Sequence, residues 1–224
     1  LQQLAGELRG RITTVVAANG GHLASNLGVV ELTLALHRMF DFLQDHLVLD
    51  VGHQCYAHKL LTGRASRFDT IRQAGGLSGY PNRDESPYDR FTTGHAGASI
   101  STALGLALAD RAAGRTCRTV AVIGDGALAS GMALEGLNHA GSCGANLIVV
   151  LNDNQMCISN TVGAMAQAFT RARTSDLYKQ LRHEMRRVLD SLPVVGSQMT
   201  STLSAVKGAI KDAVVPDHVF EHFG

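Results

Sequence analysis

Hydrophobic residues in the first 61 positions recur at helical spacing in some segments and form one short apolar run. A repeat of three or four residues predicts helices at 4–18, 28–40 and 57–61. The run 47–51 is apolar except for Asp50 and is followed by a Gly-containing turn, which predicts a strand. Because residues 28–40 are apolar on most faces, we expect this second helix to be buried.

The next stretch alternates between helical and β-branched segments. Residues 98–113, rich in Ala, Leu and Gly, and residues 127–140 predict helices. Residues 119–123 and 146–151 are rich in β-branched side chains and predict strands. Residues 78–93 are polar, contain two prolines and predict a surface loop. The alternation predicts an α/β fold, in which a parallel sheet is flanked by helices on both faces.

The character of the chain changes after Met165. Residues 170–189 are rich in Lys, Arg and His and predict an exposed helix, and residues 197–215 predict another. Neither segment has the pattern of a strand. We therefore expect one domain at residues 1–165 and a helical excursion of the same domain at 166–224.

Composition excludes several classes of protein. The 224 residues are 45% hydrophobic and 17% charged, which suits one large domain with a buried core. A net charge of +1 and the absence of Trp argue against a nucleic-acid or anionic-membrane partner. No apolar run approaches the roughly 20 residues that a membrane span needs. We expect a cytoplasmic protein, although a chain that begins at Leu1 leaves a removed plastid leader open.

The four cysteines show neither a Cys-x-x-Cys pair nor zinc-type spacing with histidine. We interpret them as reduced thiols. We also expect His37, His46, His139 and His183 to be ordinary surface or packing residues.

Two predicted strand ends carry side chains suited to a cation. Asp125 lies between Gly124 and Gly126 at the end of one strand, and Asn154 follows the other strand, 29 positions later. The carboxyl ends of parallel strands open on the same edge of a sheet, where ligands bind. One carboxylate and one amide oxygen leave positions on Mg²⁺ for two phosphate oxygens, and a helix that begins near Ala127 favours an anion. Either motif alone is a common turn, but together they predict a magnesium–diphosphate site.

These residues belong to a series of short motifs. In chain order they are Gly-Gly-His-Leu-Ala-Ser at 20–25, Asp-Val-Gly-His-Gln at 50–54, His-Lys-Leu-Leu-Thr-Gly-Arg at 58–64, Thr-Gly-His-Ala at 93–96, Gly-Asp-Gly-Ala at 124–127 and Leu-Asn-Asp-Asn at 151–154. The series resembles the 1-deoxy-D-xylulose-5-phosphate synthases, thiamine-diphosphate enzymes of the transketolase-like superfamily. The resemblance covers essentially the whole chain. Transketolases and two-component dehydrogenases share the metal motif but lack most of the series.

The resemblance implies a thiamine-diphosphate-binding fold in which residues 1–165 form the diphosphate domain. It implies that Mg²⁺ is bound by the side chains of Asp125 and Asn154 and by the backbone carbonyl of Met156. His22 would face the substrate at the reactive end of the cofactor, and His22 and His53 are the candidates for proton handling. The remaining cofactor contacts that it implies are His53, Gly94, His95, Ala96, Gly124, Gly126, Ala127 and Asn154.

The reaction implied by the resemblance is the condensation of pyruvate with glyceraldehyde 3-phosphate, with loss of carbon dioxide, in isoprenoid and thiamine precursor synthesis. The family also implies a homodimer. Its activating Glu comes from a pyrimidine-binding domain that has no counterpart after Gly224, and its C-terminal domain is absent too, so we expect this chain alone to lack synthase activity. Two alternatives stay open: another transketolase-like enzyme, and a truncated, non-catalytic homologue.

Overall fold

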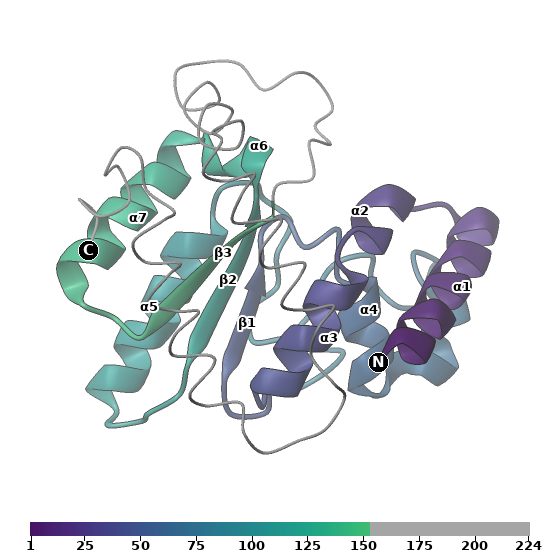
Figure 1. Cartoon of the computed structure of the whole chain (residues 1–224), viewed down its shortest axis with the longest axis horizontal. Helices are drawn as coiled ribbons and strands as arrows, with labels where there is room; N and C mark the ends of the chain where they lie inside the picture. Colours follow the sequence, from purple (N-terminus) through teal and green to yellow (C-terminus); the bar gives the residue numbers. More distant parts are fainter. Residues whose placement is uncertain (153–224) are drawn as a thin grey trace, which may run out of the picture. The chain divides into compact units, whose positions relative to one another are not determined.

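A computed structural model describes residues 1–152, and residues 153–224 lie outside the described part. At its centre is a parallel sheet with the strand order β1-β2-β3 (Figure 1). Its strands are β1 (His46–Leu49), β2 (Thr119–Gly124) and β3 (Leu147–Asn152). Because all three strands run in the same direction, their carboxyl ends open on one edge of the sheet.

Helices precede the sheet and connect its strands. They are α1 (Gln2–Asn19), α2 (Leu23–Leu27), α3 (Val30–Met39), α4 (Tyr56–Lys59), α5 (Ser99–Ala112), α6 (Asp125–Leu128) and α7 (Gly131–Cys143). Two further helical turns follow α4, a π-helical turn η1 (Leu60–Arg64) and a 3-10 turn η2 (Ala65–Thr70).

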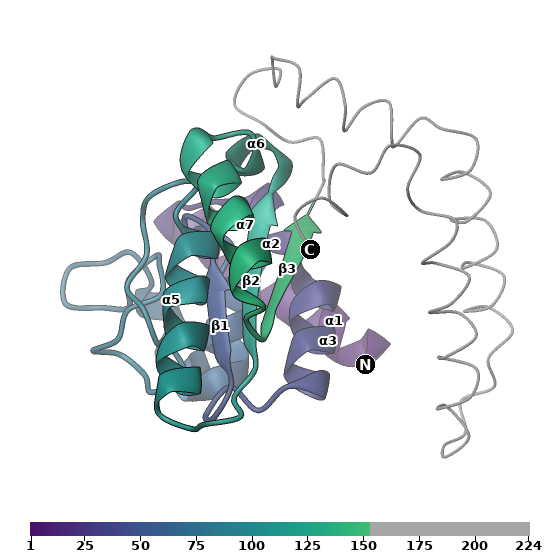
Figure 2. The same ribbon diagram turned by 90° about the vertical axis from the view of Figure 1, so that its left-hand side faces the viewer.

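Helices cover both faces of the sheet. Leu47 of β1 and Val120 of β2 belong to a hydrophobic cluster that includes residues of α1 and α3. Their neighbours Val48 and Ala121 are also buried, and strand alternation directs them to the opposite face. There α5 packs across β1 and β2, and α7 packs against α5 (Figure 2). The predicted α/β architecture is confirmed.

The predicted helix at 28–40 is right in position and wrong in its burial. A separate short helix, α2, precedes it, and α3 begins at Val30. Val30 and Leu34 are buried, whereas Arg38 and Met39 are exposed. The reason is that, within residues 1–152, α3 packs on α1 and α4 along one side.

The segment predicted at 127–140 is two helices, α6 and α7. They are separated at Ser130, where the backbone is extended and the side-chain oxygen caps α7 by accepting a hydrogen bond from Ala133 N at 3.4 Å. Ser at this position is a preferred helix cap, so the break has a local cause.

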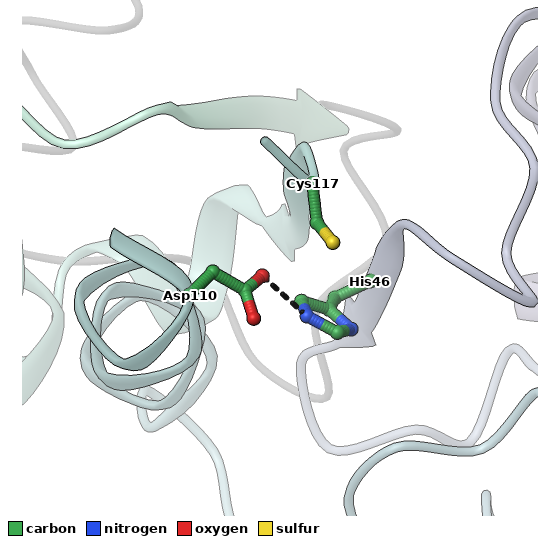
Figure 3. Close-up of side chains that lie close together, drawn as sticks. All are labelled: His46, Asp110 and Cys117. Atoms are coloured by element: carbon green, nitrogen blue, oxygen red, sulfur yellow. Dashed lines mark hydrogen bonds and ion pairs between the residues drawn. The ribbon is translucent and has the colours of Figure 1, made fainter. Parts of the chain in front are cut away.

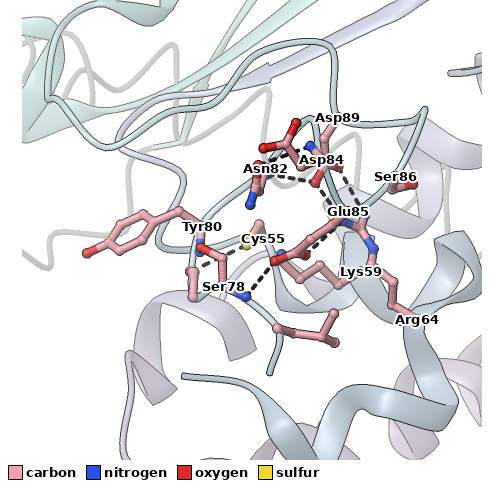
Figure 4. A network of polar contacts seen from close by, with 12 residues as sticks. Cys55, Lys59, Arg64, Ser78, Tyr80, Asn82, Asp84, Glu85, Ser86 and Asp89 are labelled. Atoms are coloured by element: carbon pink, nitrogen blue, oxygen red, sulfur yellow. Dashed lines mark hydrogen bonds and ion pairs between the residues drawn. The ribbon is translucent and has the colours of Figure 1, made fainter. Parts of the chain in front are cut away.

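The loop at 78–93 contains no helix or strand, as predicted, but it is not simply a surface loop. Its inner side carries Glu85 and Asp89, which pair with Lys59 and Arg64 from the α4–η1 segment (Figure 4). Asp89 is 4% exposed. Polar composition suggested solvent exposure, whereas the carboxylates are buried because cations of another segment compensate their charge.

Some predictions fall outside the described residues. These are the boundary at 165, the helices at 170–189 and 197–215, and the metal ligands Asn154 and Met156. Among the helices at 1–152, none combines the length and apolar character needed to cross a bilayer.

Candidate functional site

The carboxyl ends of β2 and β3 lie side by side. Gly124 is paired in register with Asn152, and a Cβ added at Gly124 would lie 4.0 Å from the Asn152 carbonyl oxygen. Asp125 follows at once, is partly exposed and begins α6. Asn154 and Met156 come two and four positions after Asn152 in the sequence, outside the described residues. The described part therefore places Asp125 at the ligand-binding edge of the sheet.

Asp50 ties the end of β1 to the loop that precedes α5. Its carboxylate is 2% exposed and accepts hydrogen bonds from Gly97 N at 2.9 Å and Ser99 N at 3.1 Å. Gly97 has φ +80, and a Cβ there would lie 2.2 Å from Ser130 Oγ. Any larger residue would collide with the cap of α7, so the glycine lets the loop at 93–98 lie against the segment that follows Asp125.

A cavity opens between the end of β1 and this loop. Residues that line it include Asp50, Thr93, Gly94, His95 and Ser99. The hydroxyls of Thr93 and Ser99 are buried and have no hydrogen-bond partner among the described residues. Since buried polar atoms are normally satisfied, the cavity has unused capacity to hydrogen-bond a polar ligand.

His22 and His53 face one another. Their ring centroids are 5.1 Å apart in an edge-to-face arrangement. Asn26 holds their loops together: its side-chain nitrogen donates to the backbone oxygens of His22, at 2.7 Å, and His53, at 2.8 Å. Its side-chain oxygen accepts from Tyr56 N at 2.9 Å. One fully buried amide thus sets the spacing of the two histidine loops.

Both imidazoles favour the neutral form. Burial and the nearby Arg72 guanidinium lower the pKa of His22. Burial and the neighbouring His22 lower the pKa of His53, with Asp50 acting in the opposite direction. His53 Nδ1 is buried with no partner in residues 1–152. Near neutral pH each ring therefore keeps an unprotonated nitrogen that can accept a proton.

The structure brings the predicted site residues into two groups, and their roles stay predictions. His22 and His53 form one. The other is the edge of the sheet, where the loop with Gly94, His95 and Ala96 adjoins the segment with Gly124, Asp125, Gly126 and Ala127. The turn after β1 connects the groups, since a Cβ at Gly52 would lie 2.1 Å from Thr93 Oγ1.

Sequence reasoning missed Asp50 and Asn26. Asp50 has a signal in the sequence, because a charged residue lies near the end of the apolar predicted strand and begins the Asp-Val-Gly-His-Gln motif. Asn26 follows the Gly-Gly-His motif and has no spacing that marks it, so only the packing reveals its contacts.

Comparison with known proteins identifies the family. The family profile described as 1-deoxy-D-xylulose-5-phosphate synthase matches residues 1–224. Over all 224 residues, the chain is 53% identical to the 1-deoxy-D-xylulose-5-phosphate synthase of Desulforudis audaxviator and 49% identical to that of Treponema pallidum. It spans 35% and 36% of the lengths of these two relatives.

Solved transketolases share the fold. The transketolase of Leishmania mexicana is 25% identical with a TM-score of 0.65, and a variant from Pichia stipitis is 27% identical with a TM-score of 0.63. Each match covers 75% of this chain and 30% of the transketolase. The full-length match of the profile and the identities near 50% are decisive: the chain belongs to the 1-deoxy-D-xylulose-5-phosphate synthase family.

Proposed function

We propose that this chain forms the diphosphate-binding half of a thiamine-diphosphate site. The enzyme would condense pyruvate with glyceraldehyde 3-phosphate to 1-deoxy-D-xylulose 5-phosphate and carbon dioxide. The observation that carries the proposal is the edge of the sheet, where Asp125 after β2 adjoins the loop at 93–98 that Asp50 anchors. The family relationship supports the choice of reaction.

The chemistry of the edge fits a magnesium diphosphate. Asp125 offers the hard carboxylate oxygen that Mg²⁺ prefers, and the Asn154 side chain and Met156 carbonyl would complete the protein ligands. Backbone at Gly124, Gly126 and Ala127 would adjoin the diphosphate, and the unsatisfied hydroxyls of the cavity are suited to a polar ligand. Gly94, His95 and Ala96 are exposed beside it and would contact the cofactor, as would His53.

The cofactor, when bound, supplies the electron sink for the carbon that loses carbon dioxide. The protein's part is to orient the reactants and to move protons. His22 is the more exposed of the two histidines and would face the substrate, while His53 lies half-buried behind it. Because both pKa values are lowered, each ring is neutral near pH 7 and keeps one unprotonated nitrogen that can take up a proton.

Calorimetry on the complete polypeptide that contains this chain tests the proposal. Thiamine diphosphate should bind in the presence of Mg²⁺ and at least about tenfold more weakly without it, since the metal bridges protein and diphosphate. Asp125→Asn should remove most of that metal dependence, because it loses the charged ligand. Asp84→Asn, which alters an exposed carboxylate in the 78–93 loop, is the matched control. Metal dependence that survives in Asp125→Asn would contradict the assignment.

The similarity to solved transketolases supports a second candidate, transfer of a ketol group from a ketose phosphate. Assays of the complete protein with pyruvate or with a ketose phosphate as donor separate the two. We expect turnover with pyruvate and little with the ketose. We further propose small-molecule substrates, a homodimer and a cytoplasmic location, with residues 1–165 as the diphosphate domain and 166–224 as its excursion.

A further inference from the structure

A second cluster of ligand-type side chains lies at the opposite edge of the sheet. His46 begins β1, Asp110 lies in the last turn of α5, and Cys117 comes two residues before β2 (Figure 3). Their ligand atoms all lie within 4.8 Å of one another. His46 and Asp110 are buried, and Cys117 is half-buried and a free thiol. Parallel strands put this amino-terminal edge far from the carboxyl edge that carries Asp125.

The surrounding structure already orients the carboxylate. Arg115 Nε donates to Asp110 Oδ1 at 2.9 Å, which leaves Oδ2 to face His46 Nε2 at 2.7 Å. Arg115 therefore acts on the Asp110 carboxylate as outer-shell partners act on metal ligands.

Hydrogen bonding within the fold does not satisfy the imidazole. His46 Nδ1 is buried and has no partner among the described residues, so within residues 1–152 the bond between Nε2 and Asp110 is the ring's one hydrogen bond. His46 Nε2 and Asp110 Oδ2 share a proton at 2.7 Å, and a divalent cation in place of that proton would bind both atoms while Nδ1 carries the ring N–H. The Cys117 sulfur lies close enough to be the third ligand.

We propose that His46, Asp110 and Cys117 bind one divalent cation of the zinc class. Zinc accepts nitrogen, oxygen and thiolate ligands at about 2.0–2.3 Å, which puts tetrahedral ligand atoms roughly 3.3–3.7 Å apart. The ligand atoms here lie within 4.8 Å of one another, with Nε2 and Oδ2 at 2.7 Å, so side-chain shifts of about 1 Å give that geometry. The thiolate selects zinc over the hard Mg²⁺ of the other edge. Because Cys117 is half-buried, a water can occupy the fourth position. A bound cation would therefore link β1, α5 and the residues that lead into β2.

Cobalt(II) is the probe for this site, because a thiolate bound to it gives a charge-transfer absorption that oxygen and nitrogen ligands do not. The complete polypeptide is titrated with cobalt(II) chloride in excess Mg²⁺, which keeps the Asp125 edge occupied by a spectroscopically silent ion. We expect a near-ultraviolet charge-transfer band and tetrahedral visible bands, both displaced by one equivalent of Zn²⁺.

Three variants decide the assignment. Cys117→Ser should lose the charge-transfer band, and Cys143→Ser, a change at another half-buried free thiol, should keep it. His46→Gln should weaken Zn²⁺ binding by about tenfold or more, since loss of an outer-shell partner alone costs about 10- to 100-fold. Far-ultraviolet circular dichroism checks that each variant is folded. The proposal is overturned if the wild type shows no such band, or if the band persists in Cys117→Ser.

Discussion

Within the described residues, the Asn26 side chain makes all its hydrogen bonds to backbone atoms. Two of these atoms are carbonyl oxygens, which require donors, and the third is the Tyr56 N–H, which requires an acceptor. An amide satisfies all three, and a carboxylate of the same shape does not, because it has no N–H. The spacing of His22 and His53 therefore depends on the chemistry of this one buried group.

Asn26→Asp keeps the shape of the side chain and removes both donors. We expect it to lower the free energy of unfolding by about 1–3 kcal/mol, since two backbone carbonyls then face a buried oxygen. It should also reduce kcat/KM at least about tenfold, because the histidine loops separate. Denaturant unfolding and steady-state kinetics of the complete protein measure the two effects.

Ile12→Val is its control. Ile12 is fully buried in the interior of α1, has no polar group and lies two helical turns before the segment that leads into His22. It should destabilise the fold and leave kcat/KM close to that of the wild type. An equal loss of kcat/KM in both variants would mean that Asn26 acts only through stability.

The side chain of His37 makes the stability of the fold depend on pH. Burial and the adjacent His58 lower the pKa of His37 from 6.5 to about 4. The unfolded chain binds a proton on this ring below about pH 6.5, and the folded chain does not until about pH 4, so stability falls as the pH drops through this window. Relative to His37→Gln, the wild type should lose about 1 kcal/mol more between pH 7 and pH 5, after allowance for partial exposure of the ring.

Urea unfolding at the two pH values measures this difference. His139→Gln, which changes an exposed histidine of α7, should show the same pH dependence as the wild type. If His37→Gln loses as much stability on acidification as the wild type, the ring is not the group responsible.

At the level of elements, the close approach of α5 and α7 depends on Gly136. A Cβ at this position would lie 2.8 Å from Ser101 Oγ, 3.1 Å from Ser101 N and 3.2 Å from Ile100 Cγ2. One of these atoms is backbone, so the helices would have to separate. The packing of α5 on α7 affects the site, because α5 begins at the loop that Asp50 anchors and α7 follows its cap, Ser130, which lies against that loop.

Gly136→Ala should lower the free energy of unfolding by about 1–3 kcal/mol, the usual cost of overpacking. Gly105→Ala is the matched change in α5, at an exposed position with nothing within 4 Å of the added Cβ. It should raise stability by about 0.5–1 kcal/mol, because alanine is the better helix former. Thermal or denaturant unfolding compares them, and stabilisation by Gly136→Ala would show that the helices are not tightly packed.

Local patterns predicted most elements, and their failures have physical causes. The strands at 119–123 and 146–151 and the helix at 98–113 were recognised within a residue or two, because their periodicity and composition are strong. The burial of α3 was misjudged because it depends on which partners pack against it. The inner side of the 78–93 loop was misjudged because the compensating cations lie at Lys59 and Arg64.

Across the described molecule, one buried ionic network joins the segment after β1 to the loop that leads into the site. Asp89 accepts from Arg64 Nη1 at 2.5 Å and from Asn82 N at 2.9 Å, and it pairs with His58 Nε2 at 2.9 Å. Glu85 accepts from Ser78 N at 2.6 Å and pairs with Lys59. Only a few residues separate Asp89 from Gly94, which lines the cavity, so the network fixes the start of the segment that reaches the carboxyl edge of the sheet.

Asp89→Asn should lower the free energy of unfolding by about 3–5 kcal/mol, because Arg64 is left as a buried charge without its main partner. The 78–93 loop should exchange its amide hydrogens faster, and hydrogen exchange with mass spectrometry reads this directly. Asp84→Asn, at an exposed position in the same loop, should change neither quantity appreciably. Unchanged exchange in Asp89→Asn would mean that the loop is held by other contacts.

The sequence by itself determined the order of strands and helices, the α/β class, the family and the motifs at Asp50–Gln54, Thr93–Ala96 and Gly124–Ala127. These are local properties, set by periodicity and by residue types at short spacing. The tertiary structure alone decided which distant groups meet. It joined His46 to Asp110 and Cys117, which have no zinc-type spacing, and it placed Asn26 between two histidine loops. Such contacts depend on strand order and helix packing, which no short stretch of sequence encodes.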